Sequence, residues 1–556
     1  MERRVLIAFV VSAVIFAVWS LLFPPAAPQQ TRPGLTEGER PAPAVDRENE
    51  DLRGVTGGER ETDERAAVDA VTGTEERTVE LSDERVAVTV TNRGAAVASY
   101  RLLGYEDDVG NPVDLVQTVD LPDRALPLQL LTEEGPDDRL YAIQEEGERG
   151  VTLRWSDGQG SYVQKRFELD PETFGLDVEV EAAGRLAESR LAVGTGLRDM
   201  SAEERNSRLA LWGEVVVFAD GEIERYRRKK VNEPRRLVPS SVAFVGFEDS
   251  YFLSLLRPRS AVEDIELTPL TVMVGDVAEP GAEAEEAEEV SVVRVAVGLV
   301  DGRFSGEILG APKRYDLLQR IGGGVERVLD FGIFGPISVL FLKVLRWIYG
   351  HVGNYGVAII LLTVGIRLIL FPLMHTSTVS MRKMQRVQPK VKEIQARYKK
   401  KKGDTQARAK MNQEVMALYK EEGVNPMGGC LPLLVQMPIL WALYKLFLNS
   451  IELRHAPFML WIDDLSIKDP YLITPILMTA TMWLQQRLAP QAGDPQQQRI
   501  MRMMPLIFGI MFLQFPAGLV LYWLTNNVLS IVQQEITLRM IGERGRNGRP
   551  PKGARK

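Results

Sequence analysis

Residues 357–373 read VAIILLTVGIRLILFPL, an apolar run in which Arg367 is the only charged residue. A run of this length can cross about 30 Å of hydrocarbon as an α-helix. An arginine inside such a helix is costly to keep away from water, so by default it indicates a functional site. The alternative is a snorkelling arginine, because Leu373 lies about 9 Å farther along the helix and the inner headgroups are within reach.

Other polar residues in the apolar runs favour the functional interpretation of Arg367. They are Thr363, Gln436, Gln485 and either Asn526 or Asn527. Thr363 lies one helical turn before Arg367, and the others belong to other runs. This many polar side chains predicts a hydrated cavity around the arginine rather than a lone snorkelling side chain.

The charges that flank the apolar runs predict six membrane spans with both termini in the cytoplasm. Residues 376–428 carry 13 Lys/Arg against 5 Asp/Glu, and the tail after Ile536 is also basic. The positive-inside rule places both segments in the cytoplasm, and Arg3 and Arg4 place the N-terminus there too. Besides 357–373, the apolar runs are 5–23, 336–349, 431–448, 471–488, 504–514 and 519–532.

One of these seven runs must lie elsewhere, because termini on the same side require an even number of spans. We expect it to be 336–349, which is short and whose two charges, Lys343 and Arg346, share one helix face. The run 5–23 is expected to be an uncleaved anchor, with a cleaved signal peptide as the alternative. The sequence FPAG at 515–518 predicts two short helices joined by a tight outer turn.

The segment between the first two spans predicts an all-β domain on an unstructured tether. Residues 24–77 are rich in Pro, Gly and Glu and cannot bury enough apolar surface to order themselves. From residue 78 the apolar residues alternate with period two, which is typical of a β-sandwich. Residues 24–335 sum to a charge of −26, and 279–289 form an acidic loop. The domain contains no His and no Cys, so a structural or docking role is favoured over catalysis.

The basic segment after Arg367 predicts a helical hairpin. Its first helix carries an apolar seam, its turn is basic, and its second helix ends at Gly423. We expect Pro389 to start a fresh helix rather than to lie within one. The seam is Met384, Val387, Val391, Ile394 and Tyr398; the basic turn is Lys399, Lys400, Lys401 and Lys402; the second helix presents Met411, Val415 and Leu418. The lysines either set topology and contact anionic lipids or form a docking surface for a ribosome or targeting factor.

Cysteine and histidine counts exclude several kinds of site. A single cysteine, Cys430, excludes an internal disulfide framework and multi-cysteine metal sites. The three histidines are far apart in sequence, which disfavours histidine-based metal or triad chemistry. We therefore expect no cofactor, no metal and no enzymatic activity.

Three stretches carry a resemblance to a known family. VNPMGGCLPLLVQMPILWALYKLF at 424–447, FPAGLVLYWLTNN at 515–527 and GIRLILFPL at 365–373 resemble the YidC membrane protein insertase family, of the Gram-negative type with a large periplasmic domain. The resemblance implies a polytopic α-helical membrane protein of six spans with a five-helix insertase core, plus an all-β supersandwich periplasmic domain. It also implies location in the bacterial inner membrane with both termini cytoplasmic.

The family resemblance implies a mechanism and a set of site residues. Arg367, with Thr363 and Gln436, would line a hydrophilic groove that is open to the cytoplasm and to lipid. The acidic residues of a nascent membrane protein would be attracted to Arg367 while its apolar span moves into lipid. The implied contacts for that span are Leu440, Met478, Tyr522 and Trp523. The implied partners are nascent membrane proteins and Sec translocon components. A second tyrosine is expected after Tyr522, and Trp523 replaces it, which puts any role for that hydroxyl in doubt.

Functions from two other classes are alternatives. A small-solute transporter could use Arg367 as an anion site, but it would need inverted repeats or paired broken helices, which the sequence does not show. A periplasmic carbohydrate enzyme on a membrane anchor would leave five spans without a role and lacks a catalytic constellation. The insertase is therefore the favoured function.

The predicted parts of the chain, in order, are a transmembrane anchor at 1–23, a disordered periplasmic tether at 24–77, a periplasmic β-supersandwich domain at 78–330, an interfacial amphipathic helix at 331–352, transmembrane helix 2 at 353–375, a cytoplasmic basic hairpin at 376–428, transmembrane helix 3 at 429–450, a periplasmic loop at 451–470, transmembrane helix 4 at 471–488, a cytoplasmic loop at 489–502, transmembrane helices 5 and 6 at 503–536, and a basic cytoplasmic tail at 537–556.

Overall fold

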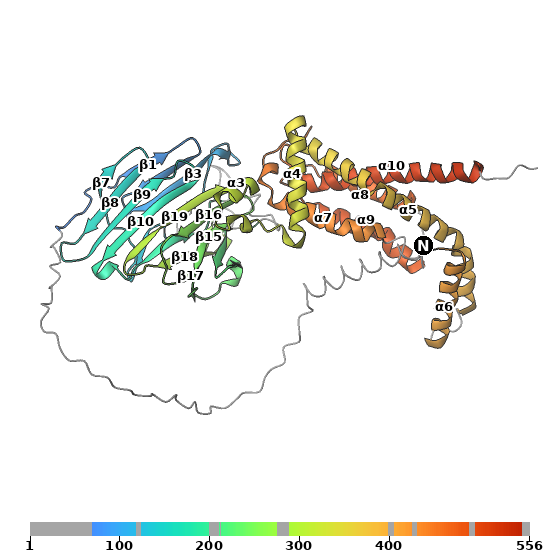
Figure 1. The fold of residues 1–556 in the computed structure, drawn as a ribbon, viewed down its shortest axis with the longest axis horizontal. Helices are drawn as coiled ribbons and strands as arrows, with labels where there is room; N and C mark the ends of the chain where they lie inside the picture. The colour runs from blue at the N-terminus through green and yellow to red at the C-terminus, as the bar shows by residue number, and fades with distance from the viewer. Residues whose placement is uncertain are drawn as a thin grey trace, which may run out of the picture. The chain divides into compact units, whose positions relative to one another are not determined.

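The computed structural model describes a helical region and an all-β domain (Figure 1). The residues it describes are 69–117, 124–199, 211, 213–274, 288–398, 405–424, 431–488 and 495–547. The predicted anchor, the predicted tether up to residue 68, the acidic loop up to residue 287 and the four lysines of the hairpin turn lie outside the described residues.

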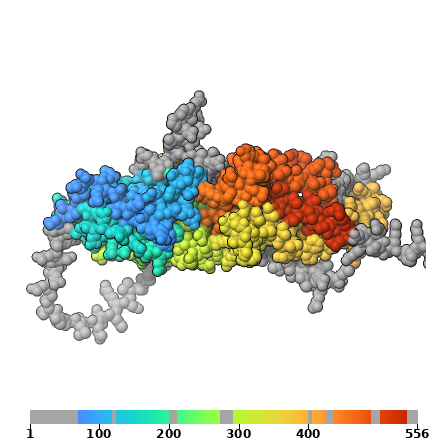
Figure 2. All heavy atoms as spheres, turned by 90° about the horizontal axis from the view of Figure 1, so that it is seen from above, coloured from blue at the N-terminus to red at the C-terminus, as the bar shows by residue number. Residues whose placement is uncertain are grey.

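The helical region contains seven long helices among the described residues. They are α4 (Gly335–Val352), α5 (Tyr355–Tyr398), α6 (Thr405–Glu421), α7 (Leu431–Asn449), α8 (Ile473–Leu488), α9 (Pro495–Phe512) and α10 (Ala517–Asn547). Helix α10 packs along α5 and α8 and lies beside α5 in the space-filling view (Figure 2). Helix α4 packs against α5 and α7 and runs across their ends in Figure 1.

Length and composition alone single out two described segments as able to cross a membrane. These are Gly332–Val352, which comprises the short helix η4 (Gly332–Phe334) and α4, and α5. Leu434–Asn449 and Arg502–Phe512 are shorter apolar helices. The count of six spans is therefore a prediction that these lengths do not establish.

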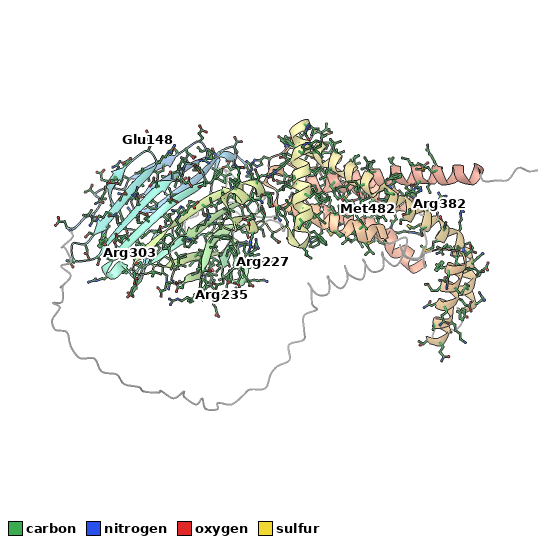
Figure 3. All side chains as sticks on the ribbon, in the orientation of Figure 1. Glu148, Arg227, Arg235, Arg303, Arg382 and Met482 are labelled. Atoms are coloured by element: carbon green, nitrogen blue, oxygen red, sulfur yellow. The ribbon has the colours of Figure 1, made fainter. Side chains whose placement is uncertain are left out.

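Helix α5 corrects the expectation that Pro389 starts a new helix. The helix is continuous through both Pro372 and Pro389. A proline inside a helix removes one backbone hydrogen bond and costs about 3 kcal/mol or more. Packing offsets this cost here, because Val387 and Val391 are buried against the following helix. Arg382, labelled in Figure 3, lies on this extension of α5.

The predicted hairpin of α5 and α6 is confirmed. Val387, Val391 and Val424 form a small core with Met384, Val415, Leu418 and Tyr419 packed against it. Polar contacts join the two arms outside this core. The Tyr398 hydroxyl donates to Glu414 at 2.6 Å, and Lys390 pairs with Glu422 at 2.5 Å. The apolar seam predicted from the sequence therefore holds the arms together.

Two helices are joined by a turn near the predicted position, but the turn is at 513–516 rather than 515–518 and the helices are longer than expected. Helix α9 ends at Phe512 and α10 begins at Ala517. The backbone N–H of Ala517 donates to Ile467 at 2.7 Å and that of Gly518 to Leu465 at 2.9 Å, which fixes the turn to the preceding loop. Helix α9 begins at Pro495, within the predicted loop 489–502, and α10 continues to Asn547, within the predicted tail.

The all-β domain consists of three antiparallel sheets among the described residues. The first sheet has β1 (Thr78–Ser82), β2 (Val86–Thr91), β3 (Ala96–Glu106) and β4 (Pro112–Asp114). The second has, in order, β13 (Glu222–Tyr226), β12 (Glu214–Ala219), β15 (Val242–Glu248), β16 (Phe252–Pro258), β19 (Arg303–Pro312), β10 (Gly175–Ala183), β9 (Tyr162–Leu169), β8 (Gly150–Ser156) and β7 (Ala142–Glu146). The third has β14 (Arg235–Leu237), β17 (Ile265–Val274), β18 (Glu288–Gly298), β11 (Arg190–Thr195), β5 (Leu130–Thr132) and β6 (Gly135–Pro136).

Alternating side chains of these strands build the core of the domain, as their period of two predicts. In β9, Val163, Phe167 and Leu169 are almost completely buried, whereas Arg166 between them is exposed. Strand β9 pairs with β8 so that Val151 faces Phe167. Short helices complete the domain and its exit: η1 (Gly184–Leu186), η2 (Arg228–Lys230), α3 (Tyr315–Ile321) and η3 (Val325–Val328).

Lys165 is a cation in the middle of this apolar core. Its side chain is fully buried, and its Nζ donates to the carbonyls of Gly94 at 2.9 Å, Ala95 at 2.9 Å and Leu128 at 2.6 Å. Burial lowers the pKa of Lys165 to about 7. Lys165 therefore donates hydrogen bonds to three buried backbone carbonyls in two loops. Without Lys165 these carbonyls would lack a hydrogen-bond donor.

We expect Lys165→Met to destabilise the β domain by at least about 2 kcal/mol, because an unsatisfied buried carbonyl costs about 1–3 kcal/mol. Arg166→Met, next to it on the exposed face, is the matched control and should be near neutral. Thermal unfolding of the full-length protein, followed by the β-sheet circular dichroism signal, measures both.

The pH dependence gives a second signature of Lys165. The native pKa is depressed to about 7 whereas the unfolded pKa is about 10.4, so the unfolded chain binds more protons between these values. The native protein should therefore gain stability relative to Lys165→Met as the pH rises from 7 to 10. A difference that does not change with pH would contradict a buried, titrating lysine.

Candidate functional site

Arg367 of α5 is held by polar groups of α10. Its Nε donates to the Asn526 side-chain oxygen at 2.8 Å. Its Nη2 donates to the Ser530 hydroxyl at 2.5 Å and to the Asn526 backbone carbonyl at 3.3 Å. The Ser530 hydroxyl in turn donates to the Asn526 carbonyl at 2.7 Å. Two helices distant in sequence therefore fix the guanidinium in one orientation.

The groups that hold Arg367 are neutral. Among the described residues no carboxylate forms an ion pair with it, and its Nη1 makes no hydrogen bond. The side chain of Arg367 is only partly buried. On α5 it lies between the buried residue Ile366 and the exposed residues Leu368 and Ile369. An uncompensated cation in an apolar helix favours any anion that can reach it.

Gln436 and Tyr522 form a second polar contact one helical turn away from Asn526. The Gln436 side-chain amide donates to the Tyr522 hydroxyl at 2.8 Å, which joins α7 to α10. The other amide atom of Gln436, Oε1, is buried without a hydrogen-bond partner among the described residues. An acceptor left in that state costs about 1–3 kcal/mol and is satisfied when a donor or a water approaches.

The contacts between α5 and α10 continue from Arg367 toward the hairpin. Gln533 donates to the Phe371 carbonyl at 3.3 Å, and His375 hydrogen bonds to Thr537 at 3.2 Å. We call this row of contacts the polar seam; on α10 it comprises Tyr522, Asn526, Ser530, Gln533 and Thr537. The last three were not predicted from the sequence, although their spacing of 3 and 4 residues in a helix places them on one face.

Other polar residues named from the sequence lie away from the guanidinium. Thr363 is buried and donates to the Ile359 carbonyl of its own helix at 2.6 Å. Asn527 faces α8 instead. Its side-chain amide Nδ2 donates to the Met478 carbonyl and to the Thr481 hydroxyl, each at 3.4 Å. Gln485 is half-buried on α8 and makes no hydrogen bond with the seam among the described residues. Of the two asparagines left open, Asn526 is therefore the one that contacts Arg367.

The four residues expected to contact a client span differ in accessibility. Leu440 and Trp523 are half-buried, and Trp523 packs on Phe512 with ring centroids 5.1 Å apart. Met478 is completely buried and Tyr522 is 2% exposed, so neither presents a surface to lipid in this conformation. Lys399, Lys400, Lys401 and Lys402 lie outside the described residues.

The geometry supports binding of polar or acidic groups without covalent chemistry. Arg367 offers charge, the Ser530 hydroxyl and the amides of Gln436 and Asn526 offer both donors and acceptors, and apolar helices surround them. Such a set lowers the cost of moving a polar segment through hydrocarbon.

Two family models match the chain. The family described as "60Kd inner membrane protein" matches residues 347–544, and the "YidC periplasmic domain" matches residues 78–344. The polar seam from Arg367 to Thr537 lies within the first match, and the three sheets lie within the second.

Full-length relatives agree with these matches. The membrane protein insertase YidC of Syntrophus aciditrophicus is 33% identical and covers 96% of this chain and 99% of its own. The membrane protein insertase YidC of Geobacter metallireducens is 35% identical and covers 96% of this chain and 98% of its own. A solved structure of an active YidC insertase is 18% identical, with a TM-score of 0.35, and covers 84% of this chain and 94% of its own. With family models over both parts and relatives matching end to end, the chain belongs to the YidC membrane protein insertase family.

Proposed function

We propose that this chain inserts nascent membrane proteins into the bacterial inner membrane, and that the polar seam is the wall of the groove that receives them. The observation that supports this most is Arg367, a cation held by neutral groups with no carboxylate partner among the described residues. Its full charge is therefore available to an acidic residue in the segment that a client must move across.

The proposed mechanism has two parts. The polar leading segment of a client exchanges water for the seam, so that the cost of burying its polar groups falls. The apolar span of the client then leaves along the half-buried faces of Leu440 and Trp523 and enters lipid. Its burial, at about 25 cal/mol per Å² of apolar surface, drives the step. Met478 and Tyr522 would join this path after an outward movement of α8 or α10.

The proposed topology places both termini in the cytoplasm and the β domain in the periplasm, with six spans, five of them in the core. Helix α4 passes the length and composition test for a span, but it crosses the ends of α5 and α7 (Figure 1). Its exposed Leu340, Trp347 and Tyr349 suit a helix lying at the membrane surface. We therefore keep α4 as the interfacial helix.

The proposed partners follow from charge. The hairpin of α5 and α6 and the basic tail would bind a ribosome or a targeting factor and contact anionic lipids. Sec translocon components are proposed partners for clients that have several spans or long outer segments. The apolar core that clamps the hairpin arms would hold the lysine-rich turn away from the membrane.

Replacing Arg367 tests the charge directly. Arg367→Ala should lower insertion of a single-span client with an acidic outer segment by about tenfold or more, because a charged hydrogen bond contributes about 1.5–3 kcal/mol. Arg367→Lys should retain much of the activity. Insertion into vesicles that contain the purified protein, scored by protease protection, measures the effect.

Two controls make the result specific. Arg303→Ala removes an exposed arginine of the β domain, and this variant should insert the client as the native protein does. A client whose outer acidic residues are replaced by amides should lose its dependence on Arg367. Equal losses for acidic and neutral clients would contradict an electrostatic role.

The hairpin turn is tested by its lysines. Changing Lys399, Lys400, Lys401 and Lys402 to Gln should weaken binding of ribosomes to the full-length protein in vesicles, most strongly at low salt. The matched control changes Arg382, Lys383, Arg386 and Lys392 to Gln, which removes the same charge from the helix arm. Sedimentation with the vesicles reports binding. Equal weakening by both variants would show that only bulk charge matters, and the turn would not be a docking site.

A further inference from the structure

A hollow lies between α8 and α9, away from the polar seam. It has a volume of about 600 Å³, and none of its described lining residues belongs to α5, α7 or α10. The walls are large apolar side chains that stand open to the surroundings, such as Ile476, Leu506 and Ile510 at 60%, 54% and 63% exposure. Met482, labelled in Figure 3, marks this part of α8. We call this hollow the α8–α9 groove.

Small residues make the floor of the α8–α9 groove. Gly509 of α9 lies so close to Thr479 of α8 that an added Cβ would collide with the threonine side chain. Ala480 lies beside this contact and also lines the groove. The helices therefore touch along the floor, and the bulky residues on either side leave a slot between them.

The groove is apolar along its length and basic at one end. Arg502 lines that end and is exposed, and among the described residues it forms no ion pair. Arg487 lies over the ring of Trp483, which also lines the groove, with its guanidinium carbon 3.7 Å from the ring centroid. The described residues that line the groove include no Asp or Glu. In the proposed topology this end faces the cytoplasmic headgroups.

The dimensions of the groove match one lipid chain. From Arg502 to Phe512 the α9 helix rises about 15 Å, which matches the roughly 15 Å depth of one leaflet's hydrocarbon. A client helix about 10 Å across would need roughly twice the 600 Å³ over the same length. A single extended acyl chain is narrower and fits a slot whose floor is a helix contact.

We propose that the α8–α9 groove binds an anionic phospholipid, with one acyl chain along Leu506 and Ile510 and the headgroup phosphate at Arg502 and Arg487. Basic residues between membrane helices on the cytoplasmic side are suited to such headgroups. The bound lipid fills the slot between α8 and α9. The orientation rests on the proposed function, but lipid binding is measured without any client, so the two can fail separately.

Native mass spectrometry of the full-length protein tests the site. The protein is extracted from phosphatidylcholine vesicles with or without phosphatidylglycerol, and retained lipids are counted. Leu506→Trp, which fills the slot, and Arg502→Gln should each lower phosphatidylglycerol retention by about tenfold. The matched controls are Ile507→Trp, at a 58% exposed residue outside the groove, and Arg303→Gln, at an exposed arginine of the β domain, and both should retain it.

Photocrosslinking identifies the occupant. A benzoylphenylalanine at Ile510 should gain the mass of one phospholipid in the same vesicles. Equal retention by all four variants would overturn the site, and so would equal retention of phosphatidylcholine and phosphatidylglycerol. A crosslink to a client span or to a second copy of the chain, in place of lipid, would also overturn it.

Discussion

Holding a guanidinium inside an apolar helical region is costly. Hydrogen bonds between α5 and α10 reduce this cost, and the packing of these membrane helices depends on them. Arg367 is hydrogen bonded to Asn526 and Ser530, which lie one turn apart on α10, and no carboxylate among the described residues compensates its charge. This requires α5 and α10 to pack side by side, and the polar seam continues between them to His375 and Thr537. The same contacts that stabilise the buried charge therefore define the site proposed for clients.

Features with a local sequence signal could be predicted well. The period of 3 and 4 in the hairpin seam predicted the packing of Val387 and Val391, because an amphipathic helix must bury its apolar face. Proline and glycine after Phe515 predicted the turn before α10. Arg367 was found because a lone charge in an apolar run is too costly to be common without a function. The functional assignment itself depended on family resemblance rather than on these patterns.

Features set by tertiary packing could not be predicted in the same way. Pro389 has the local chemistry of a helix start, yet packing against α6 carries α5 through it. Met478 has an apolar side chain of the kind found at lipid-facing positions, but the fold buries it completely. Ser530 looks like an ordinary helix residue until α5 is placed beside it and its hydroxyl meets Arg367. In each case the decisive contact comes from a helix far away in sequence.

A polar seam that receives clients must be wetted from the cytoplasmic side, and thiol labelling can detect this. The Ser530→Cys variant, made in a Cys430→Ser background, is treated with a charged, membrane-impermeant maleimide added to one side of sealed vesicles. We expect modification from the cytoplasmic side only, whereas Met478→Cys, at a completely buried position, should stay unmodified. Protection of Ser530→Cys from both sides, or labelling only from the periplasmic side, would contradict a groove open to the cytoplasm.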